Sequence, residues 1–296
     1  MPTISTPSKI AGTQSYTDTV YFSGSTSHER EEVVRQVIKD TGAILVPPYD
    51  HPDIMLGQGT AAYEMDEQYC KLRNAGESSI SSSQGGKKDS SDQDKGKGKG
   101  LRVVITPVGG GGLLSGTTVY FSDRPDTYVF GAEPSFEGGN DAQIGLSSNP
   151  PKRIETVKTL TIADGLRTPL GLNPWKIFTS GSDAKPKYLE GVYSVSEEQI
   201  KETMRLVLER MKVFVEPSAV VGLAVILYDP DFRRWAYEKQ KAEGGGAWDV
   251  GVVFSGGNTT VEAIVGLFGG KAGQEEKRAE SKVGSDGTAV AENIAG

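Results

Sequence analysis

The chain has 296 residues, a net charge of −7, one cysteine (Cys70) and two histidines (His28 and His51). The acidic balance argues against a broad basic surface for nucleic acid or anionic membrane, and no apolar run reaches the about 18 residues that cross a bilayer. One cysteine excludes a disulfide framework, and two histidines exclude a His-rich metal centre. No apolar leader begins the chain, so we expect a cytoplasmic protein.

Two stretches of the sequence are too polar to form a core. Residues 74–100 and 269–296 are rich in Ser, Gly, Lys and acidic residues and hold almost no large apolar side chains. Such segments cannot bury enough surface to offset the entropy of ordering. The sequence therefore predicts a disordered insert and a disordered tail.

The remaining segments alternate between strand and helix patterns. Before the insert they predict a strand at 19–22, a helix at 28–40 that Ser27 caps and Gly42 ends, a strand at 43–46 and a helix at 54–72. After it they predict a buried strand at 101–108, a helix after four glycines, a strand at 127–132, a helix opened by the Ser196/Gln199 capping box, a helix at 219–228 and a buried strand at 250–254. This alternation indicates an α/β fold with a parallel sheet.

Four consecutive glycines, Gly109–Gly112, follow the first buried strand after the insert. Glycines let the backbone wrap closely and point several N–H groups into one concavity, and the start of a helix adds positive potential. A tight turn is the alternative interpretation. The spacing fits neither the dinucleotide fingerprint nor the Walker loop, where Thr117 stands in place of lysine. The pattern therefore favours a site for one small phosphate.

Five segments carry a family resemblance, in this order: ITPVGGGGLLSG, GAEPS, TIADGLRTPLGLNPW, ERMKVFVEPSA and VVFSGGN. Together they resemble the serine racemase and serine/threonine dehydratase family of fold-type-II (tryptophan synthase β-like) pyridoxal-phosphate enzymes. The resemblance covers residues 3–72 and 101–268. It implies a chain without the family's N-terminal part, in which residues 1–55 are the remainder of a small α/β domain. Residues 56–268 are then the large cofactor-binding domain, interrupted by the insert.

The resemblance also implies a cofactor site. Pyridoxal 5'-phosphate would be held at its phosphate by Gly109, Gly110, Gly111, Gly112 and the Leu113 amide. Ser255 would hydrogen-bond the pyridine nitrogen, and a hydroxyl there does not enforce a charged pyridinium. Glu216 and Gly165 are expected near the cofactor. An ordinary turn after a strand is the other interpretation of Ser255.

A divalent metal site is implied by a second part of the resemblance. Glu133, Asp141 and the backbone carbonyl near Gly139 match the family's metal ligands, and hard oxygen ligands suit Mg²⁺ or Ca²⁺. The loop is longer than in the animal racemases, so Glu137 is a substitute ligand. A solvated acidic loop is the alternative. By contrast, the acidic segment at 50–53 is interpreted as a turn.

The residues that begin the family's reaction do not occur in this sequence. The family uses a Schiff-base lysine in an S-x-K-x-R-type segment and an S-G-N-H-G-like segment, and neither is present. Lys9 belongs to a different motif, so the sequence predicts no catalytic residue. Because the first elements of the small domain are absent too, we expect exposed apolar faces.

Two functions stay open at this point. The first is a serine/threonine dehydratase or serine racemase that acts on small hydroxy amino acids by α-proton abstraction and β-elimination, as a homodimer. The second is a non-catalytic chain that binds phosphate or pyridoxal phosphate, or a partner of full-length subunits. Cysteine-synthase-like chemistry is disfavoured because four glycines replace the G-T-G-G-T loop. Neither function involves nucleic acid or a membrane.

Overall fold

The structure is a computed structural model that describes residues 1–5, 7–81, 100–180 and 188–269. Nearly all of the predicted tail and most of the predicted insert lie outside the described residues. The first eight residues of the predicted insert are described, and they continue the long helix α3 (Pro52–Ser81) rather than starting a separate segment. The predicted helix at 54–72 is therefore longer than expected.

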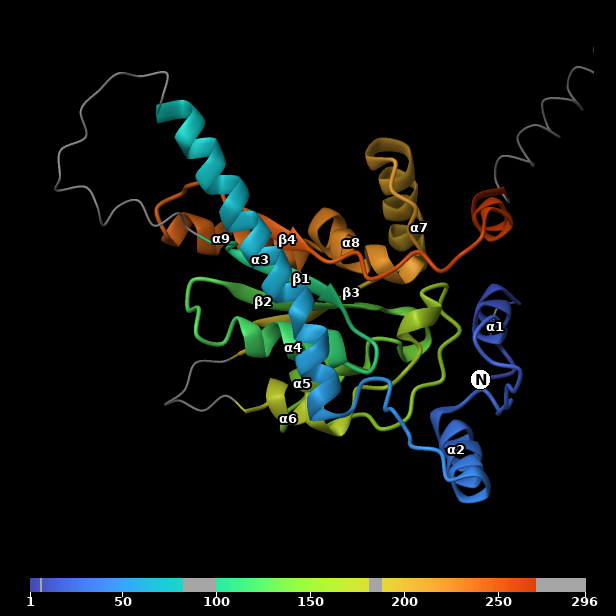
Figure 1. Cartoon of the computed structure of the whole chain (residues 1–296). Helices are drawn as coiled ribbons and strands as arrows, with labels where there is room; N and C mark the ends of the chain where they lie inside the picture. The colour runs from blue at the N-terminus through green and yellow to red at the C-terminus, as the bar shows by residue number, and fades with distance from the viewer. Residues whose placement is uncertain (6, 82–99, 181–187, 270–296) are drawn as a thin grey trace, which may run out of the picture.

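A four-stranded parallel sheet forms the centre of the molecule (Figure 1). Its strand order is β3-β2-β1-β4, and every neighbouring pair is parallel. The strands are β1 (Val103–Pro107), β2 (Tyr128–Pro134), β3 (Gly191–Val195) and β4 (Val250–Val252). The predicted α/β class is therefore confirmed, and three of the four strands lie where the sequence predicts them.

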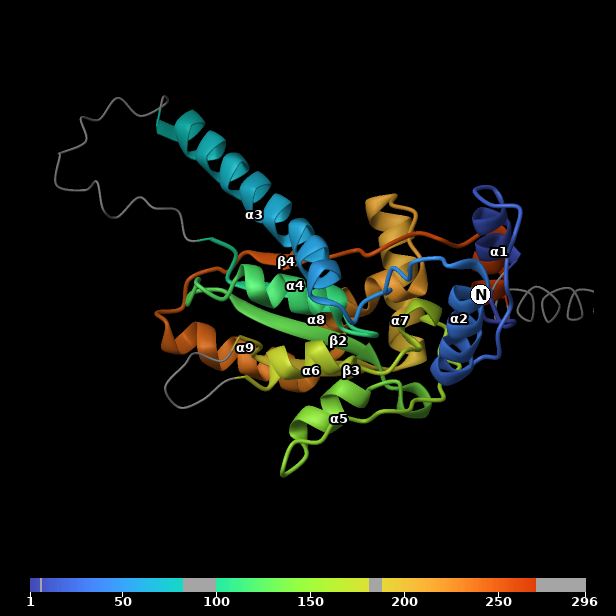
Figure 2. The ribbon, with the colours of Figure 1, turned by 60° about the horizontal axis from the view of Figure 1, so that its bottom comes forward.

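Helices cover both faces of this sheet (Figures 1 and 2). Val103 and Ile105 of β1 enter one apolar core, and Val104 enters the other. The first core is covered by α7 (Glu197–Leu206), α8 (Val221–Tyr228) and α9 (Pro230–Ala242), and the second by α3, α4 (Gly112–Tyr120) and α6 (Leu172–Phe178). Burial on both faces explains why β1 is almost continuously apolar, with Thr106 as its one polar residue, instead of alternating.

The helices α3 and α4 cross at a pair of glycines. A Cβ atom at Gly116 would lie 2.2 Å from the carbonyl oxygen of Met55 and 2.4 Å from the amide nitrogen of Gly59. Side chains at this point would push the two backbones apart, so the contact requires glycine. The crossing fixes α4, and with it the glycine loop that precedes α4.

The N-terminal part consists of α1 (Pro7–Gln14) and α2 (Ser27–Thr41). The predicted cap at Ser27 is wrong by one residue, because Thr26 is the N-cap. The Thr26 hydroxyl accepts a hydrogen bond from the Glu29 amide at 3.3 Å, and the Glu29 carboxylate accepts one from the Thr26 amide at 2.9 Å. Gly42 ends the helix at φ +70°, as predicted.

Replacing Thr26 with alanine is expected to lower the free energy of unfolding by about 1 kcal/mol, because it removes this capping box. Urea denaturation followed by circular dichroism measures the change. The neighbouring exposed Ser25 takes no part in the box, so Ser25→Ala is the control and should shift the midpoint by much less. Equal midpoints for the two variants would contradict the assignment.

The predicted strands at 19–22 and 43–46 are wrong. Both segments lack strand hydrogen bonding in the structure, and apolar side chains there are exposed, for example Ile44 at 92% and Val46 at 72%. Only an isolated bridge between Pro2 and Ser23 forms nearby. A strand exists only when a neighbour completes its ladder, and no segment of the described residues pairs with either of these in a ladder. The expected exposure of apolar faces is confirmed for these side chains.

Shorter elements complete the described part of the chain. They are α5 (Asp141–Ser147), the short turns η1 (Phe136–Gly138), η2 (Asp164–Leu166), η3 (Val207–Met211) and η4 (Pro217–Val220), and a helix at 261–269. None of the described helices combines the length and apolar character needed to cross a membrane.

Candidate cofactor site

The predicted site residues lie at one end of the sheet, where the carboxyl ends of the strands meet. Ile105 of β1 pairs with Val252 of β4, so the glycine loop after β1 and Ser255 after β4 leave the sheet at the same end. Phe130 of β2 also pairs with Ile105, which brings Glu133 to that end. Ligand sites of open parallel sheets lie at the carboxyl ends of the strands. The topology therefore brings the predicted phosphate, ring and metal residues to a common edge.

The glycine loop presents unpaired backbone donors. Gly111 is the N-cap of α4 at φ +90° and provides no side-chain cap. In the described part of the chain, the amides of Gly109–Leu113 donate no hydrogen bond to a carbonyl or side chain. Helix N-terminal amides need an acceptor, and an anion supplies one. The loop therefore fits a phosphate group.

The same glycines are packed too closely to carry side chains. A Cβ at Gly110 would lie 2.3 Å from ring atoms of Tyr49, and a Cβ at Gly111 would lie 2.5 Å from Leu170 Cδ1. The Tyr49 ring thus covers the loop, and burial raises the pKa of its hydroxyl. The role of Tyr49 is not predictable from the sequence, because a tyrosine after two prolines forms part of no recognised motif.

A chain of contacts through Gly165, Ser218 and Glu216 connects the glycine loop to the Ser255 loop. A Cβ at Gly109 would lie 3.2 Å from the carbonyl oxygen of Gly165, and the Gly165 amide donates to Ser218 Oγ at 3.0 Å. The Glu216 amide donates to the Gly256 carbonyl at 3.1 Å. Gly165 and Glu216 therefore lie between the two loops. Ser255 itself is exposed, and its hydroxyl bonds no other described residue.

Asp50 has a structural role. Its carboxylate accepts hydrogen bonds from the amides of Leu172 (2.9 Å) and Asn173 (2.8 Å) at the start of α6. Pro52 begins α3, so the segment at 50–53 connects elements. No group of three or more potential metal ligands of the His, Cys, Asp and Glu types occurs there or elsewhere in the described ranges.

Glu133 and Asp141 form a buried acidic pair. Glu133 is the penultimate residue of β2, its side chain is fully buried, and its carboxylate accepts hydrogen bonds from the amides of Ala142 (3.1 Å) and Gln143 (2.9 Å). Asp141 accepts one from the Leu170 amide at 2.9 Å. Within the described residues neither carboxylate has an ion pair closer than 4 Å.

Burial dominates the electrostatics of this pair. It raises the pKa of Glu133 well above the usual range, and the neighbouring Asp141 raises it further. Burial also raises the pKa of Asp141 to about 6. Gly139 is buried in the same loop, while Glu137 accepts a hydrogen bond from the Leu160 amide. Two hard carboxylates that repel each other need protons or a cation.

Comparison with known proteins supports the resemblance. The model of the family described as pyridoxal-phosphate dependent enzymes matches residues 1–237. The chain is 32% identical over 272 residues to an L-threo-3-hydroxyaspartate ammonia-lyase of Pseudomonas sp, covering 91% of this chain and 69% of the relative. It is 33% identical to a serine racemase of Dictyostelium discoideum, covering 84% of this chain and 62% of that protein.

A solved structure agrees with the sequence comparisons. The structure of maize serine racemase is similar with a TM-score of 0.67 and 26% identity, over 95% of this chain and 69% of the maize chain. The parallel sheet is therefore a feature of a known fold. The chain belongs to the family of fold-type-II pyridoxal-phosphate dependent enzymes.

Proposed function

We propose that this chain is the cofactor-binding part of a pyridoxal-phosphate dependent ammonia-lyase or racemase that acts on small hydroxy amino acids. The observation that carries this proposal is the row of unpaired amides from Gly109 to Leu113 at the start of α4. When bound, pyridoxal phosphate withdraws electrons from the α-carbon of an amino acid and makes its proton acidic.

The residues of this chain would bind and orient the cofactor. The Gly109–Leu113 amides hold its phosphate, and the free Ser255 hydroxyl is available to the ring nitrogen. The Tyr49 ring lies on Gly110 and keeps water from that side of the glycine loop. Excluding water strengthens the hydrogen bonds of the amides to an anion. The proposed assembly is a homodimer in the cytoplasm, and the elution volume in size-exclusion chromatography tests the dimer.

The alternative is a chain that binds phosphate or the cofactor without catalysis. It is favoured by the sequence, which contains neither the S-x-K-x-R-type segment nor the S-G-N-H-G-like segment. In that case the bound cofactor forms no covalent bond with the protein.

Calorimetric titration with pyridoxal phosphate, followed by borohydride reduction and peptide mapping, separates the two functions. Reduction makes any bond between a lysine and the cofactor permanent. The enzyme function is supported if a lysine is labelled and if serine, threonine or 3-hydroxyaspartate is converted either to its 2-oxo acid or to the amino acid of opposite configuration. Saturable binding with neither label nor product supports the binding protein. Absence of binding overturns both functions.

We also propose that Glu133, Asp141 and the Gly139 carbonyl hold Mg²⁺ or Ca²⁺. Both carboxyl groups have raised pKa values in the folded protein, so the folded state binds their protons more tightly than the unfolded state. The contribution of Asp141 to stability is therefore present below about pH 4 and is lost as the pH rises through about 6, whereas that of Glu133 is lost at a pH well above its ordinary pKa. A bound cation would replace the missing protons above that pH.

Millimolar Mg²⁺ or Ca²⁺ is accordingly expected to raise the melting temperature by several degrees at pH 7.5. At pH 5 the same cations should change the melting temperature very little. Differential scanning fluorimetry with and without EDTA measures this difference. The Glu133→Gln variant should lose the response, whereas replacing the exposed Glu137 by glutamine should keep it. An equal cation response of the wild-type protein and Glu133→Gln would contradict the site.

A further inference from the structure

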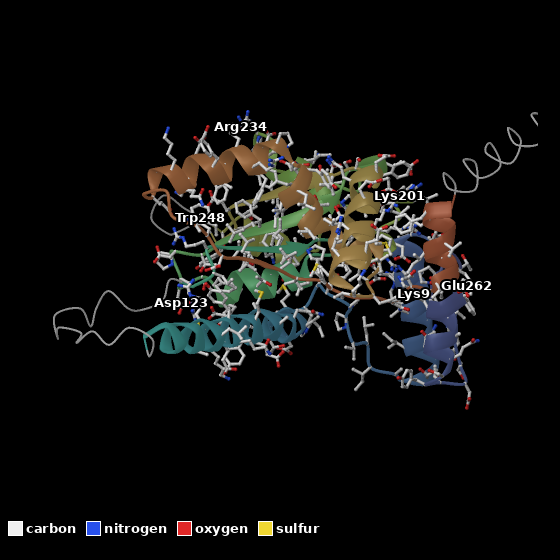
Figure 3. The ribbon with its side chains drawn as sticks, turned by 90° about the horizontal axis from the view of Figure 1, so that it is seen from above. Lys9, Asp123, Lys201, Arg234, Trp248 and Glu262 are labelled. Atoms are coloured by element: carbon white, nitrogen blue, oxygen red, sulfur yellow. The ribbon has the colours of Figure 1, made fainter. Side chains whose placement is uncertain are left out.

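Three charged side chains from separate elements meet beside the proposed cofactor site. Lys9 Nζ of α1 lies 2.7 Å from Asp164 Oδ2 of η2 and 3.9 Å from Glu216 Oε2. The three side chains are mostly buried, with exposed fractions of 24%, 23% and 13%. Figure 3 shows Lys9 close to the helix of residues 261–269, which carries Glu262. The cluster thus joins the N-terminal part of the chain to the large domain.

The Glu216 carboxylate touches the loop that carries Ser255. A Cβ at Gly256 would lie 2.7 Å from Glu216 Oε1, and the Glu216 amide donates to the Gly256 carbonyl. Glu216 Oε2 is buried and accepts no hydrogen bond from the described residues. A buried carboxylate oxygen without a hydrogen bond is costly unless a positive charge lies near it. Lys9 is the cation found within 4 Å.

The geometry of this cluster is that of an ion pair. Lys9 Nζ lies within 4 Å of the carboxylate oxygens of Asp164 and Glu216. A fixed positive charge is the role that the contacts support. We propose that Lys9 is a positioning residue of the cofactor site, whose ammonium group is the counter-ion that holds the Glu216 carboxylate against the Ser255–Asn258 loop. Its relevance to the cofactor rests on the proposed function.

The other charged groups near Glu216 do not act as its counter-ion. A cavity of about 470 Å³ adjoins the cluster and is lined by Asp164, Arg167, Asn258, the apolar residues Ile4 and Pro7, and apolar side chains of residues 261–269. The Arg167 guanidinium donates instead to the carbonyls of Thr161 and Leu160. Asp164 is a like charge, so it opposes ionisation of Glu216.

Because Lys9 and Asp164 have opposite effects on Glu216, the proposal predicts the direction in which the Glu216 pKa moves in each variant. Burial raises the pKa of Glu216, the Lys9 charge lowers it and the Asp164 charge raises it. Lys9→Met should therefore raise the pKa of Glu216 by about one unit or more, a tenfold gain in proton affinity. Asp164→Asn should lower it. General structural damage would not move this pKa in opposite directions in the two variants.

The experiment follows the Glu216 carboxyl carbon by ¹³C NMR in the protein without cofactor, with assignment by Glu216→Gln. Lys9→Arg keeps the charge and should restore the wild-type titration. Lys39→Met removes an exposed lysine from α2 and is the matched control. A Glu216 pKa that stays within about 0.3 unit of wild type in Lys9→Met, or that moves equally in Lys39→Met, overturns the proposal.

Binding of pyridoxamine 5'-phosphate, which needs no covalent bond, links this charge pair to the cofactor. In Lys9→Met the affinity should fall several-fold at pH 6 and recover at pH 8, while the wild type changes little. If the wild type does not bind this compound, the proposed function fails, but the NMR titration still decides the role of Lys9. If it binds and the Lys9→Met affinity shows no pH dependence, the positioning role fails alone.

Discussion

Replacing Gly116 with alanine is expected to lower the free energy of unfolding by about 3 kcal/mol, because the new methyl group meets backbone atoms. Its Cβ would lie 2.2 Å from the Met55 carbonyl oxygen and 2.4 Å from the Gly59 nitrogen. Neither atom can rotate away as a side chain would. The helices α3 and α4 must separate, and the core between them loses contacts around the fully buried Ala62.

Urea denaturation of the purified variant measures this loss, with the midpoint and slope fitted separately. The matched control is Gly57→Ala on α3, the other helix of the crossing, where a Cβ meets no atom within 4 Å. Alanine is the better helix former, so this control should gain up to about 1 kcal/mol. Similar stabilities of the Gly116 and Gly57 variants would show that the two helices do not touch at this point.

Gly111→Ala is expected to weaken binding of pyridoxal phosphate by about 100-fold, since it distorts the amides that hold the phosphate. Gly111 has φ +90°, where a side chain is strained, and its Cβ would lie 2.5 Å from Leu170 Cδ1 and 2.8 Å from Pro174 Cβ. The loop must move to accommodate the methyl group. Calorimetric titration of the variant and the wild type measures the affinity.

The Gly244→Ala variant is the control for the effect of backbone strain without a steric clash. Gly244 has φ +95°, no atom lies within 4 Å of its Cβ position, and it lies in the turn after α9. This variant should lose some stability and keep the wild-type affinity. If Gly111→Ala binds pyridoxal phosphate within threefold of wild type, the glycine loop is not the phosphate site.

The sequence predicts elements well where the pattern is local and complete. The apolar run of β1 and the Ser196/Gln199 capping box both specify their structure within a few residues, and both are found where expected. The apolar segments at 19–22 and 43–46 carry equally good strand patterns, but a strand also needs a neighbour with free backbone groups. Nothing in a single segment reveals whether that neighbour exists.

The sequence does not predict β3, for a different reason. Among the described strands it pairs with β2 alone, at the sheet edge, and its residues alternate poorly between buried and exposed. Tyr49 is important because its ring lies on Gly110, a contact between residues far apart in sequence. The glycine loop is predictable because the phosphate site proposed for it favours consecutive glycines. The placement of Glu133 beside Asp141 came from the family resemblance and not from spacing.

The length of α3 also determines how far its C-terminal end lies from the proposed phosphate site. It is a 30-residue helix that contacts α4 near its first turns, so its last residue lies roughly 33 Å further along the axis. The chain resumes at Gly100, at the amino end of β1, which is the end of the strand opposite the glycine loop (Figure 1). A fluorophore or affinity tag attached at the end of α3 is therefore expected to lie far from the proposed phosphate site.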